Sequence, residues 1–259
     1  RGLGDVYKRQ GEGRGHFTQA ITLEEMLLRN GHEVVEVLVG KSSTRTLPGF
    51  FNRSIHAPVK RFISPNFLPT ADNKRANLTK SFAYNLLRLP EYLRSMYYIN
   101  QRIRETGAEV VINFYELLTG FTYALFRPSV PYICVGHQYL FLHRDFEFPD
   151  KNSCQLWMLR FFTRMTALRS SKKLALSFLE MEQDDMNQIV TVPPLIRQEV
   201  TAIRPEKGDY IHGYMVNSGF ADSVENFHAK HAEVPLTFFW DRSDAEEVTR
   251  IDETLSFHQ

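Results

Sequence analysis

The chain has 259 residues, of which 43% are hydrophobic and 24% are charged, and its formal net charge is +1. These values are typical of a globular protein with room for two domains, and no apolar run is long enough to span a bilayer. Two cysteines argue against a disulfide framework and favour a reducing compartment. Because no secretory signal opens the chain, we expect a cytoplasmic protein.

The charge is unevenly distributed. Between residues 41 and 104 there are twelve Lys and Arg but only two acids, whereas residues 205–259 hold eleven acids and four bases. Two segments of opposite charge indicate two different functions.

Both ends of the chain look artificial. Residues 5–10 are similar to the translation of a sequencing adapter, so we expect residues 1–10 to be an assembly scar and the native first strand to be missing. Residues 251–259 stop as a new strand begins. We therefore expect a fragment of a longer protein.

The first motif is a glycine-rich turn that opens a helix. Gly11, Gly13 and Gly15 alternate with other residues, and a good helix follows from residue 17 to Asn30-Gly31. Free N–H groups and the helix dipole make such a turn an anion cradle, in which Arg14 would neutralise a phosphate or face solvent. His16 lies in the first turn, where the dipole favours a neutral imidazole, which binds a ligand or merely caps its own turn.

The next segments alternate between strand and helix, which predicts a parallel sheet. We expect a strand at 33–39, a short helix at 48–53, a strand at 59–63, and a long helical region at 77–106 that breaks at Leu89-Pro90. The helical region interleaves aromatic and basic residues. That pattern suits a helix lying on an anionic membrane, and it equally suits an amphipathic helix that packs on the sheet. No nucleic-acid motif accompanies the charge.

The pattern continues in the same way to a domain boundary near residue 200. The proline pair Pro193-Pro194 and a charged stretch at 204–208 bracket the linker. The expected elements are strands at 109–116, 131–138, 173–178 and 189–197, helices at 117–126 and 154–168, and, in a second α/β domain, a strand at 210–216, a helix at 220–231 and a strand at 236–240.

Four stretches turn polar where a predicted strand ends. In an open parallel sheet, ligands bind beyond the carboxyl ends of the strands, so these stretches should share one cleft. They contain the candidate site residues Gly11, Gly13, Arg14, Gly15 and His16; Asn113 and Glu116; His137 and Gln138; and Pro193, Pro194 and Arg197.

Each candidate also has a structural interpretation. Glu116 would act as a general base if partly buried, or it would only pair with a helix dipole. His137 is either a ligand contact or a core histidine. His228 and His231 share a helix face, but without a third ligand we expect no metal site.

Together, Gly11–His16, Asn113–Glu116, Val135–Gln138 and Pro193-Pro194 resemble GT-B glycosyltransferases. The chain is most similar to bacterial family-28-like members, related to the N-acetylglucosaminyltransferase that builds the lipid-linked peptidoglycan precursor. The similarity extends from Gly11 to Gln259. The loop Gly-Glu-Gly-Arg-Gly-His is less glycine-rich than that of the peptidoglycan enzyme, which leaves the acceptor undefined.

The resemblance implies an α/β fold with two Rossmann-like domains, the second one truncated: an acceptor domain at 11–200 and the first half of a donor domain at 201–259. It implies a cell-envelope glycosyltransferase that inverts the sugar carbon, needs no metal or cofactor, and takes a nucleotide-sugar donor. His16 or Glu116 would be the base, the glycines, Arg14, Asn113, His137 and Gln138 would bind the acceptor, and Pro193, Pro194 and Arg197 would form the hinge.

The resemblance also gives a role to the basic segment 41–104. Relatives with lipid-linked acceptors dock on the inner face of the plasma membrane through such a segment. The glycine-rich donor loop of the family would lie beyond Gln259, so the fragment itself is expected to be inactive. A sugar-nucleotide epimerase and a non-catalytic carbohydrate- or nucleotide-binding protein are the alternative functions.

Overall fold

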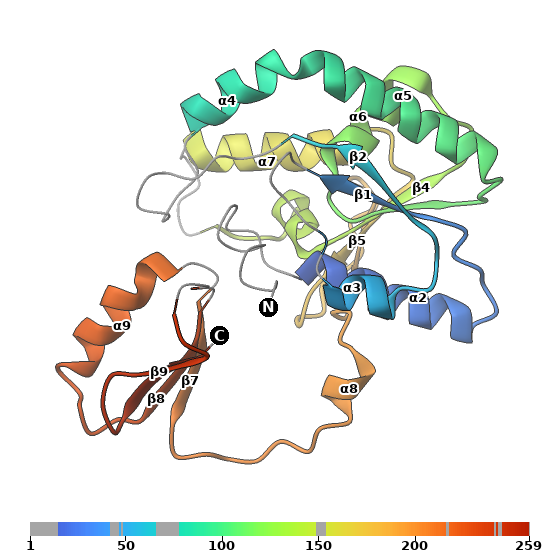
Figure 1. The fold of residues 1–259 in the computed structure, drawn as a ribbon. Helices are drawn as coiled ribbons and strands as arrows, with labels where there is room; N and C mark the ends of the chain where they lie inside the picture. Colours follow the sequence, from blue (N-terminus) through green and yellow to red (C-terminus); the bar gives the residue numbers. More distant parts are fainter. Residues whose placement is uncertain are drawn as a thin grey trace.

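The computed structural model describes residues 15–41, 47, 49–65, 78–148, 154–215, 218–240, 242 and 245–258. Figure 1 shows two α/β units, joined by a stretch that carries the short helix α8 (Gln198–Thr201). Each unit has its own hydrophobic core.

Parallel strands form the centre of the N-terminal unit. β3 (Val111–Asn113), β4 (Tyr132–Val135), β5 (Lys172–Leu176) and β6 (Ile189–Val192) pair in this order, all parallel. β1 (Val37–Lys41) and β2 (Val59–Ile63) form a second parallel pair. The predicted parallel α/β architecture is therefore confirmed.

The helices of this unit begin with α2 (Gly15–Arg29) and α3 (Gly49–Ser54). The buried carboxylate of Glu24 accepts the backbone N–H groups of His56 (3.0 Å) and Ala57 (2.8 Å), which ties α2 to the chain that enters β2. β1 begins at Val37, later than the sequence predicts. The preceding residue, Glu36, forms ion pairs with Arg102 and Lys60.

The helical region breaks where the sequence predicts it. α4 (Leu78–Leu87) ends before α5 (Leu89–Glu105), and Pro90 lies in the first turn of α5, where its missing N–H donor costs nothing. α5 contacts α6 (Leu117–Phe126), and α6 contacts α7 (Cys154–Thr166). A Cβ atom on Gly120 would come within 2.1 Å of the Met165 carbonyl oxygen, so glycine permits the close approach of α6 and α7.

The C-terminal unit has a four-stranded sheet in the order β7-β8-β10-β9. β7 (Ile211–Tyr214), β8 (Leu236–Phe239) and β10 (Leu255–His258) are parallel, and β9 (Val248–Arg250) is antiparallel to β10. The 3₁₀ helix η2 (Ser218–Phe220) leads into α9 (Ala221–His228), and the core contains Leu236, Trp240, Leu255 and Phe257. The sequence analysis missed β9, since it has only three residues, two of them exposed, and so carries little hydrophobic pattern.

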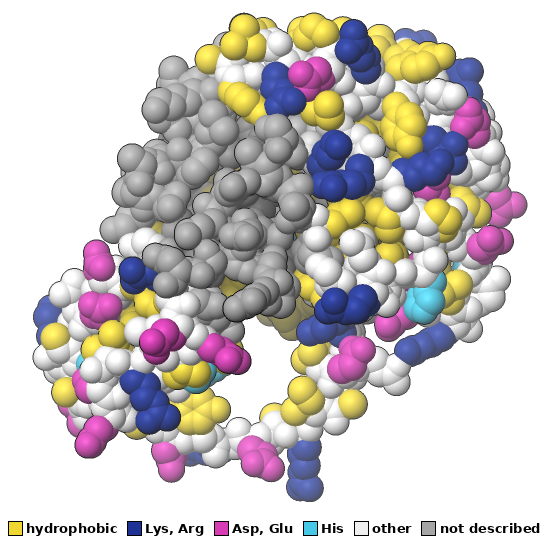
Figure 2. All heavy atoms as spheres, viewed as in Figure 1, with side chains coloured by type: hydrophobic (Ala, Val, Ile, Leu, Met, Phe, Trp, Pro, Cys, Tyr) yellow, Lys and Arg dark blue, Asp and Glu magenta, His cyan; other side chains and the backbone are white. Residues whose placement is uncertain are grey.

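Acidic side chains are frequent on this C-terminal unit in Figure 2, in line with the charge asymmetry of the sequence. Within the described residues, no helix is long and apolar enough to cross a membrane.

Candidate active site

The two sheets of the N-terminal unit meet at their carboxyl ends. Ser64, directly after β2, donates a hydrogen bond from Oγ to Oε1 of Glu116, which follows β3 (2.8 Å). A Cβ atom built on Gly40 of β1 would lie 2.7 Å from Oε2 of the same carboxylate. Because the strands within each sheet are parallel, this contact places all six carboxyl ends on one side. Ligands of open parallel sheets bind on that side.

Glu116 is the N-cap residue of α6. Its Oε1 atom accepts the backbone N–H of Leu118 (3.1 Å) as well as the Ser64 hydroxyl. A carboxylate at a helix N-terminus satisfies an otherwise unpaired donor and interacts favourably with the helix dipole. The carboxylate is therefore fixed in direction, half-buried, at the edge of the sheet.

Asn113 shapes the turn that presents Glu116. The side chain is 3% exposed, its Oδ1 accepts the Glu116 N–H (2.9 Å), and its Nδ2 donates to the carbonyls of Thr166 (3.0 Å) and Glu116 (3.2 Å). Both amide protons are therefore used inside the protein. Sequence analysis predicts a ligand contact here, but the structure gives the amide a supporting position beneath Glu116.

The neighbouring turn, after β4, carries two further predicted site residues, His137 and Gln138, which directly follow Gly136. Gly136 is buried, and His137 begins the 3₁₀ helix η1 (His137–Leu142) with an exposed side chain. The ring of Tyr139 lies 5.7 Å from that of Tyr115, which joins this turn to the turn after β3. Partial desolvation of the ring lowers the pKa of His137, which favours the neutral imidazole.

Gln138 holds an unused acceptor. Its Oε1 atom is buried and accepts no hydrogen bond in the part of the chain that the structure describes. A buried acceptor without a donor is costly, so a ligand hydroxyl that donated to this oxygen would remove the penalty.

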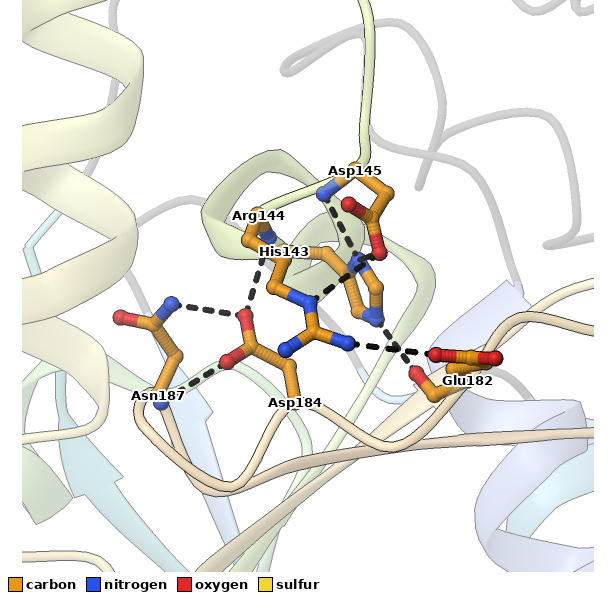
Figure 3. A network of polar contacts seen from close by, with 6 residues as sticks. All are labelled: His143, Arg144, Asp145, Glu182, Asp184 and Asn187. Atoms are coloured by element: carbon orange, nitrogen blue, oxygen red, sulfur yellow. Dashed lines mark hydrogen bonds and ion pairs between the residues drawn. The ribbon is translucent and has the colours of Figure 1, made fainter.

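A polar network fixes the other end of η1, as Figure 3 shows. The buried Asp184 carboxylate accepts the Arg144 N–H (2.9 Å), the Asn187 side-chain amide (2.7 Å) and the Asn187 N–H (3.2 Å). Desolvation alone would raise the pKa of Asp184, but the bonds from Asn187 and Arg144 outweigh it and lower the pKa.

The same network orients a buried histidine. Nδ1 of His143 accepts the Asp145 N–H (3.2 Å), so the ring proton lies on Nε2, which donates to the Glu182 carbonyl (2.9 Å). Sequence analysis missed these residues. They hold the segment that carries His137 and Gln138 against the β5–β6 connection.

The predicted anion cradle at the start of α2 lies only partly within the described residues. Gly11, Gly13 and Arg14 lie outside the described residues, while Gly15 is the exposed first residue of α2 and His16 lies half-buried in its first turn. The next residue, Phe17, packs on Phe51 of α3 with ring centroids 4.9 Å apart.

The predicted hinge residues lie apart from this group. Pro193 and Pro194 follow β6, at the carboxyl edge but beyond β5, and Arg197 is the exposed N-cap residue of α8. The adjacent Gln198 accepts a hydrogen bond from Arg29, the last residue of α2. His16 lies at the other end of that helix, about 20 Å away along its axis. The structure therefore does not bring Arg197 to His16.

Sequence analysis also missed Ser64 and Gly40. The rule that selected the other residues, a polar residue at the end of an apolar strand, selects Ser64 as well, because it follows Ile63 directly. Nothing in the sequence around Gly40 indicates that its missing side chain leaves room for the carboxylate of Glu116, which lies far along the chain.

The space at Gly40 gives a first prediction. In the Gly40→Ala variant, the new methyl group would lie 2.7 Å from Oε2 of Glu116 and 2.8 Å from Cβ of Ser64. Overpacking of this kind lowers the free energy of unfolding by about 1–3 kcal/mol. Urea denaturation measures it, with Gly15→Ala as control, where the added methyl meets nothing within 4 Å. Equal stability of the two variants would contradict the packing described.

Metal ligands are not grouped in the described part of the chain, where no three His, Cys, Asp or Glu side chains could hold an ion. His228, the last residue of α9, is buried, and its Nε2 lies 2.6 Å from Asp252 Oδ2. His231 follows the helix, and its Nδ1 lies 3.8 Å from Glu233 Oε1. The bond with His228 is the main cause that lowers the pKa of Asp252 to about 2.

Comparison with known proteins gives a family match and a structural match, and both are to glycosyltransferases. The family model for glycosyl transferase family 1 matches residues 5–251. The crystal structure of Arabidopsis thaliana UGT89C1 complexed with UDP-L-rhamnose is similar, with a TM-score of 0.50, 12% sequence identity, and coverage of 86% of this chain and 61% of that chain. No curated protein matches the chain.

These matches confirm the predicted GT-B type of α/β fold. The likeness to the plant protein shows the fold alone at 12% identity, and this chain spans only 61% of its length. Neither match supports the narrower family-28-like assignment, which stays a prediction.

Proposed function

Because the chain belongs to glycosyl transferase family 1, we propose that the full-length protein transfers a sugar from a nucleotide-diphosphate-sugar to an acceptor hydroxyl. The observation that carries this proposal is the family match over residues 5–251. The shared carboxyl edge, where Glu116, Ser64 and His137 follow three different strands, supplies the polar groups that such a reaction requires.

We assign the donor to the C-terminal unit and the acceptor to the N-terminal unit. The structural neighbour was solved with UDP-L-rhamnose, which supports a nucleotide-sugar as donor. The acceptor would lie at the carboxyl edge of β1–β6, with Pro193 and Pro194 as a stiff exit toward the second unit. No cofactor or metal is part of the proposal.

His16 is the proposed base. The positive end of α2 disfavours an imidazolium in its first turn, so a neutral ring would be ready to accept a proton. Glu116 suits that role less, because its Oε1 already accepts two hydrogen bonds. We propose instead that this carboxylate and Gln138 Oε1 orient the acceptor hydroxyl.

The proposed step is a single displacement. The acceptor oxygen gives its proton to His16 and forms a bond to the anomeric carbon, while the bond from that carbon to the nucleotide diphosphate breaks. The product would have the inverted configuration. Backbone N–H groups of the Gly11–Gly15 turn and the Arg14 guanidinium would stabilise negative charge that lies near the acceptor.

A lipid-linked acceptor at the inner face of the plasma membrane is the finer proposal. It rests on the resemblance of the loop Gly11–His16 to family-28-like enzymes and on the twelve Lys and Arg of residues 41–104, of which Lys60, Arg88 and Arg102 form ion pairs within the protein. It places the protein in cell-envelope synthesis.

The test is a transfer assay of the full-length protein with a panel of nucleotide-sugars, with and without a polyprenyl-phosphate-linked acceptor. We expect release of the nucleotide diphosphate and a glycosylated acceptor. An altered donor sugar that forms without acceptor would indicate an epimerase instead. Donor affinity with no turnover, unchanged in the His16→Ala and Glu116→Gln variants, would indicate a binding protein.

A further inference from the structure

The helix that carries His16 buries a carboxylate in a row of apolar side chains. On α2, Phe17, Ile21 and Glu24 follow one another at helical spacing and therefore share a face. Phe17 packs on the buried ring of Phe51 in α3, and Ile21 and Glu24 are 4% and 2% exposed. We propose that Glu24 is a positioning residue, which fixes α2 so that His16 reaches the acceptor hydroxyl. This inference rests on the proposed function, in which His16 is the base.

The Glu24 carboxylate binds the backbone that leads into β2. Its Oε1 accepts the N–H groups of Ala57 (2.8 Å) and His56 (3.1 Å), and its Oε2 accepts the His56 N–H (3.0 Å). Nδ1 of His56 lies 3.3 Å from the same Oε2, on a ring that is 71% exposed. Among the residues that the structure describes, no Lys or Arg pairs with Glu24. The carboxylate therefore serves to hold two backbone donors of a neighbouring segment.

A buried carboxylate is a costly way to join two elements, because it loses its hydration. Apolar contacts such as that of Phe17 with Phe51 have no preferred direction, and packed helices shift past their neighbours by about 1–2 Å in conformational changes. Hydrogen bonds to an ionised acceptor are stronger and directional. Glu24 therefore limits how far α2 slides along the segment that enters β2, which an apolar residue at this position would not do.

The strand β2 connects this anchor to the candidate site. β2 begins two residues after Ala57, and Ser64, directly after its end, donates to Glu116 (2.8 Å). The same strand thus holds α2 at one end and Glu116 at the other. Figure 1 shows α2 beside α3, with the chain running on from α3 into β2.

The position of α2 matters because proton transfer is sensitive to distance. A base must lie about 2.6–3.2 Å from the oxygen whose proton it takes, and a misplacement of about 1 Å costs about 10²-fold in rate. Glu24 is eight residues from His16, about 12 Å along the helix axis. A slide of the helix at Glu24 would therefore displace His16 by the same amount.

Steady-state transfer kinetics of the full-length protein is the first test. Glu24→Gln keeps an acceptor for the Ala57 N–H but brings an amide N–H to the His56 N–H, whereas Glu24→Leu keeps the apolar row and removes every acceptor. We expect kcat to fall about tenfold in Glu24→Gln and about 10²-fold in Glu24→Leu, with little change in the KM of either substrate. The temperature is one at which circular dichroism shows each variant folded.

Glu36 provides the matched control. Its side chain is 6% exposed and pairs with Arg102 (2.8 Å) and Lys60 (3.5 Å), so Glu36→Gln makes the same change at a buried carboxylate that does not hold α2. We expect this variant to lose stability and to keep the wild-type kcat. An equal fall of kcat in Glu36→Gln, or a wild-type kcat in Glu24→Leu, would overturn the proposal.

A second measurement needs no turnover and so separates this proposal from the proposed function. In protein with isotope-labelled histidine, the NMR signal of the His16 ring is identified by its loss in His16→Ala. It should shift in Glu24→Leu and not in Glu36→Gln, while the signal of His231, on the C-terminal unit, stays unchanged in both. If the wild type transfers no sugar, the proposed function fails and this signal alone decides whether Glu24 positions His16. An unchanged His16 signal in Glu24→Leu would overturn the proposal.

Discussion

Replacement of His16 by alanine should lower kcat for sugar transfer by about 10²–10⁴-fold, the usual contribution of a general base. The KM for the acceptor should change little, because the loss falls on the step in which the hydroxyl gives up its proton. The acid limb of the pH–rate profile, where the base becomes protonated, should also disappear. Steady-state kinetics of the full-length protein measures all three quantities.

A histidine at the other end of the same helix provides the control. His32 is exposed, and within the part of the chain that the structure describes its only hydrogen bond is the one that its backbone N–H donates to the Leu27 carbonyl (2.9 Å). The His32→Ala variant should keep the wild-type kcat and pH profile. If His16→Ala raised only KM, His16 would be a binding residue, and the base would have to be found elsewhere.

Replacement of Asp184 by alanine should lower the free energy of unfolding of the N-terminal unit by about 3 kcal/mol. The change removes the acceptor of the Arg144 N–H, the Asn187 N–H and the Asn187 side chain. Because Asp184 is fully buried, water does not replace the lost bonds. Urea denaturation followed by circular dichroism gives the value.

The pH dependence of this effect has a definite sign. The pKa of Asp184 is lowered in the folded protein, so its carboxylate stabilises the fold above the ordinary pKa of an aspartate. This stabilisation is lost as the pH falls through the lowered pKa. The difference between wild type and Asp184→Ala should therefore shrink in acid.

The neighbouring Asp185 is exposed, and its replacement by alanine should change stability by less than about 1 kcal/mol. A loss as large as that of Asp184→Ala would show that the network in Figure 3 is not what holds η1. A second readout is the acceptor KM, which should rise in Asp184→Ala because η1 carries His137 and Gln138.

Local sequence patterns predicted most of the elements. α6 and β2 have the predicted bounds, and the helical region breaks at Leu89-Pro90. Such features depend on caps, prolines and apolar runs that a short window contains. The strand β9 was missed because it is short and joins the sheet only by pairing with β10.

The candidate site was predicted only in part. A strand end that turns polar is visible in the sequence, and it identified Glu116 and His137. The partners of these residues come from far along the chain: Ser64 reaches Glu116, and Asp184 accepts the Arg144 N–H. No local pattern encodes these contacts. Surface charge is likewise not predictable from composition alone. Arg102 was counted among the bases of the segment 41–104, but in the structure it pairs with the nearly buried Glu36.

The most direct test of the proposed site is the anomeric configuration of the first product, measured by NMR on the reaction of the full-length protein. One base at the acceptor hydroxyl predicts a glycosylated acceptor whose configuration is opposite to that of the donor, and about 10²–10⁴-fold slower formation of that product by the His16→Ala variant. A product that retains the donor configuration, or a free sugar as the only product, would contradict a single displacement assisted by His16.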